Sequence, residues 1–255
     1  MSQSSTRLEI RLKEREDEYT SYKQFHVFVG TFNVNNRQAP HERSLDEWFR
    51  QATSNGDEKQ TVTVPDILAV GFQEIDTSGG AYLYDDKKKE DEWEQLVHKT
   101  IHSAFESSSE KDVTFELLNR VRLIGEHCLS NDSRCHAALL LLSGILLFVY
   151  VRTIHLPKCT FKSRSSVPTG FMGIAGNKGG VGIRFRFYET DLCFVNAHFA
   201  SGDGQTKRRN EDYQAIEARM GFTDGPVYSL KDYIWYTPTS ASSTDTSVAA
   251  GAAQW

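Results

Sequence analysis

The sequence predicts an α/β or α+β protein in which β-sheets and helices are packed in layers. Strand-like and helix-like segments follow one another between residues 25 and 220. One of them, residues 65–75, is a nearly continuous apolar run, which is typical of a strand buried on both faces. Two strand-like segments late in the chain are close enough to form a hairpin, and such mixtures of elements build layered sandwiches.

Size and composition agree with this class. The chain has 255 residues, of which 39% are hydrophobic and 25% charged, as in soluble globular proteins with one sizeable core. The formal net charge of −5 gives no general attraction for nucleic acid, although a single cleft can still be cationic. The four cysteines show no C-x-x-C spacing and the N-terminus has no apolar secretion signal, so we expect a reduced, cytoplasmic protein.

The first half of the chain is expected to hold two strands and three helices. Alternating apolar and polar residues predict strands, and apolar residues at steps of three and four predict amphipathic helices. In chain order, the predicted elements are a charged lead-in helix over 1–24, a strand over 25–34, a helix over 45–52, the buried strand over 65–75 and a helix over 90–105.

The second half is expected to be richer in strands, with a low-complexity tail. The predicted elements are strands over 115–124, 144–152, 180–188 and 191–198, a helix over 206–220 and a disordered tail over 237–255. The apolar run 137–151 is too short to cross a bilayer and is interrupted by Ser143 and Gly144. Burial in a core is therefore favoured over membrane insertion.

Two strand ends carry polar residues that a hydrophobic core does not need. Asn33 and Asn35 would share one face of an extended strand, although asparagine pairs also favour turns. Glu74 emerges from the apolar strand over 65–75, where a carboxylate is costly unless it is paired or bound to a cation. Mg²⁺ takes one or two carboxylates together with water and phosphate oxygens, so Glu74 suits a magnesium site. A salt bridge at the sheet edge is the alternative.

A third polar junction is the glycine-rich run 173–182, which contains Asn177 and Lys178. Glycines let the backbone approach an anion closely, and a lysine adds a point charge suited to phosphate. The pattern is not a P-loop, because Asn177 separates Gly176 from Lys178. A hairpin with an exposed lysine remains the alternative.

The strand over 191–198 ends at His198, with Asn196 on the same face. A histidine in that position can donate a hydrogen bond to a phosphoryl oxygen, although a lone histidine is more often structural. The helix that follows opens with the basic and acidic run 207–213, which can meet phosphates or form salt bridges. In this order, the amide pair, the carboxylate, the lysine loop and the imidazole suit metal-assisted hydrolysis of a phosphate ester, but no general base is evident.

These segments resemble the inositol polyphosphate 5-phosphatases, especially the type II subgroup of the endonuclease/exonuclease/phosphatase superfamily. The matching stretches cover most of residues 25–216 in family order: FVGTFNVN, PDILAVGFQEID, SSVPTGFMGIAGNKGGVGIRFRF, LCFVNAHFASG and KRRNEDYQAI. The resemblance implies a four-layered sandwich of two mixed sheets flanked by helices. It also implies Mg²⁺ as cofactor and removal of the 5-phosphate from phosphoinositide lipids or soluble inositol polyphosphates by direct attack of water. Contact with membranes would be peripheral, and nucleic acid would not be a partner.

The resemblance implies roles for nine residues. Glu74 is similar to the family's magnesium-ligating glutamate, with Asn35 beside the metal. Asn33 is similar to the asparagine that orients the metal site and the attacking water, and His198 to the histidine that contacts the scissile phosphate. The implied substrate-binding set is Asn177, Lys178, Asn196, Arg209 and Asn210, of which the last two belong to a motif behind the cleft.

The sequence also departs from the family pattern. The family's W-x-G-D-x-N-Y-R, P-x-W-C-D-R and S-D-H segments have no counterpart, because the likeness is lost after Trp235. Residues 128–140 look like an insertion, and aberrant splicing is one hypothesis for both features. We therefore expect a partial, incomplete catalytic domain over 25–236 without its general base, and impaired or absent hydrolysis. A non-catalytic inositol phosphate-binding or decoy fragment is the alternative. A nuclease is disfavoured by the acidic charge and the GNKGG segment.

Overall fold

The computed structural model describes residues 10–40, 45–53, 63–75, 88–106, 108, 110, 112–124, 144–170, 177–222 and 228–229. The tail over 237–255 and the inserted segment over 128–140 lie outside these residues, as do residues 1–9 of the predicted lead-in helix. Within the described part, strands and helices follow one another from β1 to β9, and all but β5, β8 and β9 of these strands fall on predicted strand segments.

Two β-sheets stack on one another. The first has the strand order β1-β2-β4-β3, in which β1 and β2 run parallel and the other neighbours antiparallel. The second has the order β5-β6-β7 and is antiparallel throughout its described strands, so only the first is mixed as predicted. The strands are β1 (Val27–Asn33), β2 (Ile67–Gln73), β3 (Phe115–Leu123), β4 (Ile145–Arg152), β5 (Cys159–Pro168), β6 (Gly179–Phe187), β7 (Thr190–His198), and the short pair β8 (Gly221–Phe222) and β9 (Tyr228–Ser229).

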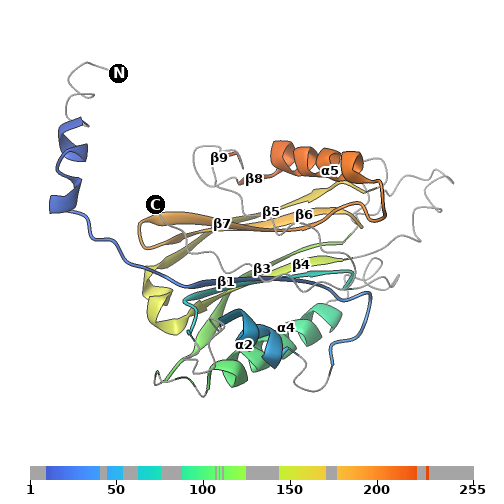
Figure 1. Cartoon of the computed structure of the whole chain (residues 1–255), viewed down its shortest axis with the longest axis horizontal. Coiled ribbons are helices and arrows are strands. Elements are labelled where there is room, and N and C mark those ends of the chain that lie inside the picture. The colour runs from blue at the N-terminus through green and yellow to red at the C-terminus, as the bar shows by residue number, and fades with distance from the viewer. Residues whose placement is uncertain are drawn as a thin grey trace.

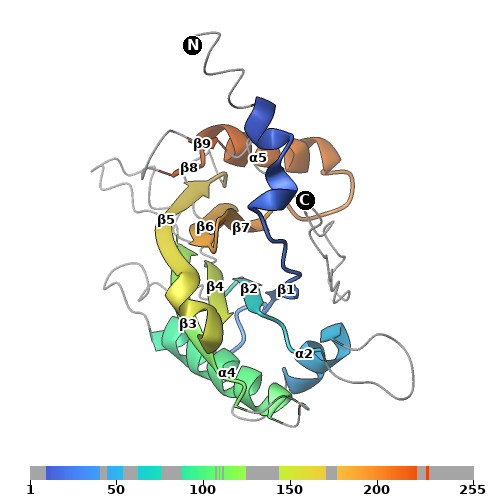
Figure 2. The same ribbon diagram turned by 90° about the vertical axis from the view of Figure 1, so that its left-hand side faces the viewer.

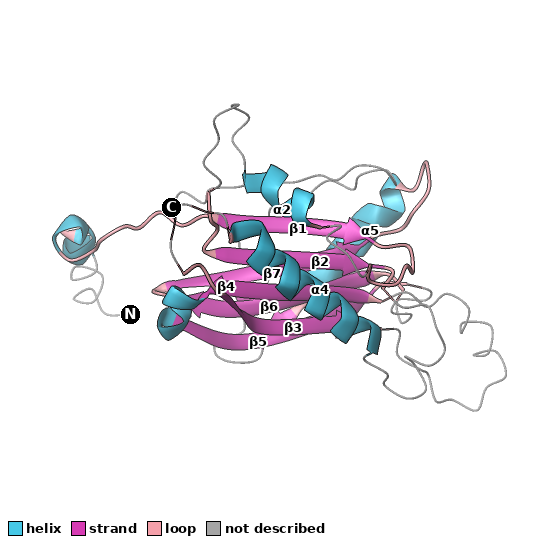
Figure 3. Ribbon diagram, turned by 90° about the horizontal axis from the view of Figure 1, so that it is seen from below, coloured by secondary structure: helices cyan, strands magenta, loops and turns pink. Residues whose placement is uncertain are grey.

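Helices cover the outer face of each sheet, which gives four layers (Figures 1 and 2). Helices α2 (Asp46–Thr53) and α4 (Lys88–Phe105) lie on the first sheet, and α5 (Thr206–Arg219) lies on the second. The view from below shows α4 crossing the strands of the first sheet (Figure 3). Short 3₁₀ helices occur at η1 (Glu16–Glu18) and η3 (Thr153–Lys158). This arrangement confirms the predicted layered class.

The three interfaces between the layers hold the hydrophobic core. Strand β2 is buried at all seven positions, because helices cover one face and the second sheet covers the other. Leu68, Val70 and Phe72 pack toward α2 and α4, whereas Ile67 and Ala69 pack between the sheets. A smaller apolar cluster lies between the second sheet and α5. The continuous apolar run in the sequence is thus explained by burial on both faces.

Some predicted elements differ in the structure. Instead of one lead-in helix, residues 10–13 are helical and Glu16–Glu18 form a 3₁₀ turn before the chain becomes extended. Strand β5 was not predicted, because its polar sequence CTFKSRSSVP lacks apolar alternation and it is held by pairing with β6. The described part of the apolar run 137–151 is strand β4, buried in the first sheet. Among the described residues, no helix is long and apolar enough to span a membrane.

The strand directions gather several polar residues at one end of the sandwich. Because β1 and β2 are parallel and in register, Asn33 lies beside Gln73. Antiparallel pairing places the end of β7 beside the start of β6, so that His198 pairs with Gly179. The two sheets stack with these ends on the same side, where the polar residues of both meet.

Candidate active site

Four side chains from both sheets converge at this end and are called here the Glu74 cluster: Asn33, Glu74, Lys178 and His198. The Asn33 Nδ2 atom donates a hydrogen bond to Glu74 Oε1 over 3.0 Å. His198 Nε2 lies 3.5 Å from the same oxygen and 2.6 Å from Lys178 Nζ. Residues separated by up to 165 positions in sequence therefore form one connected group of a carboxylate, an amide, an ammonium and an imidazole.

The backbone turns sharply where Glu74 leaves β2. Glu74 adopts a φ of 59°, in the left-handed region that non-glycine residues occupy at some energetic cost. The Asn36 N–H donates to the Glu74 carbonyl over 2.7 Å, and the Val34 N–H donates to the Gln73 carbonyl over 2.9 Å. These two bonds tie the turn after β1 to the turn after β2. They fix the carboxylate beside the end of β1.

The turn after β1 is organised by its asparagines. The Oδ1 atom of Asn33 accepts the Asn35 N–H over 2.9 Å, and Asn35 and Asn36 adopt φ values of 49° and 56°. Left-handed turns favour asparagine. Asn35 therefore lies beyond the strand and does not share a face with Asn33, so that part of the prediction was wrong. The Asn35 side chain is exposed in the turn beside Glu74.

His198 is held in its neutral form. Its pKa is lowered to about 3, mainly by burial and also by the nearby positive charge of Lys178, while a hydrogen bond with the Asn177 backbone opposes both effects. Because the ring is neutral, its 3.5 Å approach to Glu74 is a dipolar contact and carries no ion pair. The Lys178 ammonium donates to Nε2, which assigns the ring proton to Nδ1.

Lys178 is the cation of the cluster. Burial lowers its pKa, while the negative charges of Glu74 and Asp212 raise it. The side chain lies at the start of β6, next to the glycine-rich run, of which residues 171–176 lie outside the described residues. A lysine in this position offers a compact positive charge to an anion that approaches Glu74 and His198.

The donor set suits one hard divalent cation. Both contacts of the Glu74 carboxylate fall on Oε1, which leaves Oε2 open among the described residues. No group of three or more His, Cys, Asp or Glu side chains that could hold a metal occurs in the described part of the chain. A site with a single carboxylate and neighbouring amides fits Mg²⁺, which keeps waters and phosphate oxygens as its remaining ligands, better than it fits zinc.

The start of α5 supports the loop that follows His198. Asp212 is 1% exposed and accepts the Ala200 N–H over 2.9 Å. Arg209 donates to the carbonyls of Ala200, over 3.4 Å, and Gly202, over 3.1 Å. Arg209 thus acts on the loop behind the cluster, as its implied role suggests, while Asn210 is exposed on the same helix.

Asn196 lies beneath the cluster and not at its surface. It is 6% exposed, and its Nδ2 donates to the carbonyls of Phe72 and Leu146 over 3.0 and 2.9 Å. Its Oδ1 accepts from Gln73 Nε2 over 2.6 Å. Since every donor and one acceptor position of the amide is engaged inside the protein, the expected direct contact with substrate does not fit this geometry.

The sequence analysis gave no role to Gln73 and Gly71, the two residues of β2 that adjoin the Asn196 side chain. Gln73 also donates to Thr31 Oγ1 over 2.7 Å, and Gly71 provides the space in which the Asn196 side chain lies. Polar or small residues inside an otherwise apolar strand were the available signal, because Thr31 and Gln73 lie within or at the ends of buried strands.

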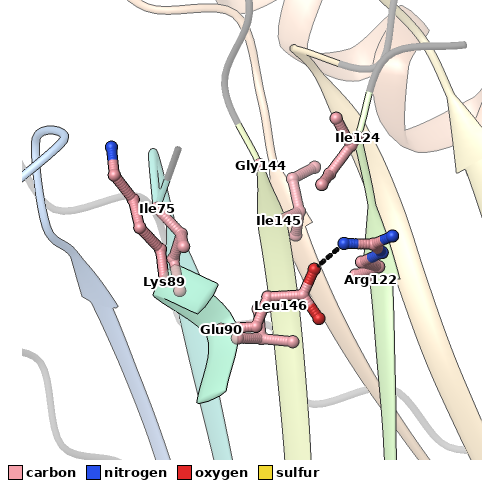
Figure 4. A pocket seen from close by; sticks show the side chains of 8 residues that line it. All are labelled: Ile75, Lys89, Glu90, Arg122, Ile124, Gly144, Ile145 and Leu146. Carbon is pink, nitrogen blue, oxygen red and sulfur yellow. Dashed lines mark hydrogen bonds and ion pairs between the residues drawn. The ribbon is translucent and has the colours of Figure 1, made fainter. Parts of the chain in front are cut away.

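Two cavities are lined by described residues, and neither contains a side chain of the Glu74 cluster. The smaller, about 10 Å³, is lined by Ile75, Lys89, Glu90, Arg122, Ile124, Gly144, Ile145 and Leu146 (Figure 4). This volume has room for a single water. The larger, about 330 Å³, lies between β3 and β5 and is lined by Glu90, Arg120, Val121, Arg122, Arg164, Ser165 and Ser166.

Two of the three arginines that line these cavities are paired with acids of α4, and the third, Arg164, donates to the Arg120 carbonyl. Arg122 forms an ion pair with Glu90, which Figure 4 shows, and Arg120 contacts Asp91 and Glu94 over 2.7 and 2.5 Å. The pairs neutralise most of the positive charge there. The Glu74 cluster therefore remains the stronger candidate for chemistry.

Comparisons with known proteins show the family to which the chain is related. Residues 140–246 match the endonuclease/exonuclease/phosphatase family 2. The chain is 35% identical over 211 residues to the type II inositol 1,4,5-trisphosphate 5-phosphatase of Mus musculus, an alignment that covers 83% of this chain and 17% of that protein. It is 29% identical over 238 residues to synaptojanin-2 of Homo sapiens, covering 88% and 14%.

A comparison with solved structures finds the same family of proteins. The inositol polyphosphate 5-phosphatase domain of SPsynaptojanin, crystallised with inositol (1,4)-bisphosphate and a calcium ion, superposes with a TM-score of 0.64 at 25% identity. The match covers 89% of this chain and 55% of that domain. The chain thus spans about half of the solved domain and less than a fifth of the two relatives.

Proposed function

Because this chain belongs to the endonuclease/exonuclease/phosphatase family and is related within it to the inositol polyphosphate 5-phosphatases, we propose that the Glu74 cluster binds a divalent cation and a phosphate ester. Mg²⁺ is the proposed cation. The proposed substrates are phosphoinositide lipids and soluble inositol polyphosphates, and the reaction is hydrolysis of the 5-phosphate. The observation that carries the proposal is the convergence of Asn33, Glu74, Lys178 and His198 from both sheets.

Each member of the cluster has a separate part in this proposal. The Glu74 carboxylate holds the cation, and Asn33 orients that carboxylate through its Nδ2 donor. Lys178 attracts and positions the phosphate, while His198 contacts the phosphoryl group as charge develops on it. When bound, Mg²⁺ supplies Lewis-acid polarisation of a phosphoryl oxygen. Asn35, whose N–H bonds to Asn33, and Asn177, whose backbone bonds to His198, line the proposed site.

Access to a lipid substrate would be peripheral. The cluster lies at the end of the sandwich, where strands finish and turns begin, so a headgroup can reach it without insertion of the protein into the bilayer. The SPsynaptojanin domain was crystallised with a soluble inositol bisphosphate, which supports a site that recognises the headgroup alone.

We further propose that turnover by this chain is slow. Among the described residues, Glu74 is the one carboxylate of the cluster, and the other acid that acts on Lys178, Asp212, is buried and accepts the Ala200 N–H, so it is not placed to take a proton from the attacking water. A missing general base lowers the rate by about 10²- to 10⁴-fold. The intact cation- and phosphate-binding groups favour binding without efficient hydrolysis, which is the second candidate function.

One experiment separates these outcomes. Purified chain is mixed with soluble inositol 1,4,5-trisphosphate, or with vesicles containing phosphatidylinositol 4,5-bisphosphate, in the presence of Mg²⁺ or a chelator. Binding and phosphate release are both measured. The proposal predicts Mg²⁺-dependent binding with little release. Phosphate release at the rate of a full-length relative would contradict the claim that a missing general base slows hydrolysis. Absence of binding would contradict the claim that the Glu74 cluster binds a cation and a phosphate ester.

A further inference from the structure

Three of the four strands that bear the Glu74 cluster also meet in a buried polar contact one layer deeper. Thr31 lies two residues before Asn33, Gln73 immediately precedes Glu74, and Asn196 lies two residues before His198. Their side chains form the inter-sheet node, which we define as Thr31, Gln73 and Asn196. Gln73 Nε2 donates to both Thr31 Oγ1 and Asn196 Oδ1, over 2.7 and 2.6 Å.

The node is one of the polar contacts that join the two sheets, together with the Glu74 cluster and the bond from Arg164 of β5 to the Arg120 carbonyl of β3. Asn196 belongs to the second sheet, and its Nδ2 donates to the backbone of β2 at Phe72 and of β4 at Leu146. The neighbouring side chains between the sheets form an apolar cluster. Apolar packing is non-directional, whereas an amide with both donors engaged fixes one position and orientation. The node therefore adds a directional contact that constrains how one sheet lies over the other at this end.

A glycine makes room for this contact. A Cβ atom at Gly71 would lie 2.5 Å from Asn196 Cγ and 2.7 Å from its Oδ1, closer than real Cβ contacts allow. Gly71 is in the middle of buried strand β2, where its conformational freedom is not needed. The close approach of the amide explains why no side chain stands there.

We propose that Asn196 is a positioning residue that holds His198 of the second sheet at its working distance from Glu74 of the first. The inference rests on the function proposed for the Glu74 cluster. Asn196 does not touch substrate or metal. It acts through the short backbone segments that connect it to His198 and connect Gln73 to Glu74, and it thereby fixes the 3.5 Å separation of His198 Nε2 and Glu74 Oε1.

The first test is the affinity of the full chain for Mn²⁺, measured by calorimetric titration in wild type and in Asn196→Ala. Loss of a group that orients metal ligands weakens metal binding by about 10- to 100-fold. Ile183→Ala is the matched control, because Ile183 is equally buried between the sheets among apolar neighbours. We expect weakened Mn²⁺ binding in Asn196→Ala and wild-type binding in the control. Equal affinity in wild type and Asn196→Ala would overturn the inference.

The second test is a double-mutant cycle with Gly71→Ala. In the wild-type background the new methyl group collides with Asn196, so Mn²⁺ binding should weaken. In the Asn196→Ala background the collision is absent, and the same change should have little further effect. Independent, additive effects of the two substitutions would contradict a direct positioning contact.

A third measurement separates failure of this inference from failure of the proposed function. If wild type binds no Mn²⁺, the proposed function fails, but the geometry can still be measured. A crystal structure of Asn196→Ala should then show His198 Nε2 farther from Glu74 Oε1 than the 3.5 Å of the wild type. An unchanged separation would overturn the positioning role, whatever the metal affinity.

Discussion

Lys178 Nζ lies 2.6 Å from His198 Nε2, so an ammonium group from the start of β6 donates to a neutral imidazole at the end of β7. Strand pairing alone brings the two segments together, because Gly179 and His198 are partners in the antiparallel ladder. The contact aims one positive charge and one hydrogen-bonding ring at the space in front of Glu74. In the proposed function, Lys178 would face the phosphate and Glu74 the metal ion.

The first prediction concerns the charge of Lys178. In the wild type, the positive charge of Lys178 lowers the pKa of His198. Lys178→Met keeps the length of the side chain but removes this charge. We expect the His198 pKa to rise in this variant and to remain below its usual value, because burial is the larger cause. NMR titration of the imidazole measures it. Lys207→Met, on an exposed position of α5, is the control and should leave that pKa unchanged.

The second prediction concerns the carboxylate. Glu74→Gln retains the size of the side chain and removes its negative charge, so divalent cation binding should weaken by at least about tenfold. Isothermal titration with Mg²⁺ measures the loss. Glu116→Gln serves as the control, because Glu116 is exposed on β3 and lies outside the cluster. A Glu74→Gln variant that binds Mg²⁺ as tightly as wild type would remove Glu74 from the metal site.

The third prediction is a pH dependence of stability. The His198 pKa is lowered in the folded state to about 3, below that of an unfolded histidine, so the unfolded state binds a proton first as pH falls. Above the unfolded pKa both states are neutral and His198 has no effect. Below it, down to about 3, the free energy of unfolding should decrease by up to about 1.4 kcal/mol per pH unit. Urea unfolding of wild type and His198→Asn measures this, and identical pH profiles would contradict the buried neutral ring.

The fourth prediction concerns thiol reactivity. Burial raises the pKa of Cys159 to about 11 and that of Cys193 to about 12. Because only the thiolate is nucleophilic, alkylation of Cys193 in the folded chain should be slower than that of an unperturbed thiol by roughly three orders of magnitude. Mass spectrometry of iodoacetamide-treated protein locates the modified sites. Rapid labelling of Cys193 under native conditions, at the rate found in urea, would show that β7 is not packed as described.

Much of the fold could be predicted because periodicity records burial. Strand β2 is apolar at almost every position since both of its faces are covered, and α4 shows apolar residues at helical spacing since one face packs on the first sheet. Strand β5 escaped prediction because it is an edge strand whose faces are largely polar or half exposed. Its pairing with β6 is a tertiary effect that a local pattern does not contain.

The site was predictable in its composition and less so in its geometry. Glu74 and His198 stood out because polar residues that end apolar strands need a partner. The turn conformation of Asn35 depends on backbone bonds to a distant segment, which spacing along one strand does not reveal. Asn196 was assigned to substrate on the basis of its neighbour His198, but the identity of its partners is set by how the sheets stack.

The most direct test is titration of the full chain with inositol (1,4)-bisphosphate in the presence and absence of Mg²⁺. If the cluster holds a cation beside a phosphate, each ligand should bind saturably and tighten the binding of the other. Glu74→Gln should abolish the effect of Mg²⁺ on binding, and Lys178→Met should weaken binding of the phosphate ester. Binding that is indifferent to Mg²⁺ and to both substitutions, or no binding at all, would contradict the assignment of this cluster as the functional site.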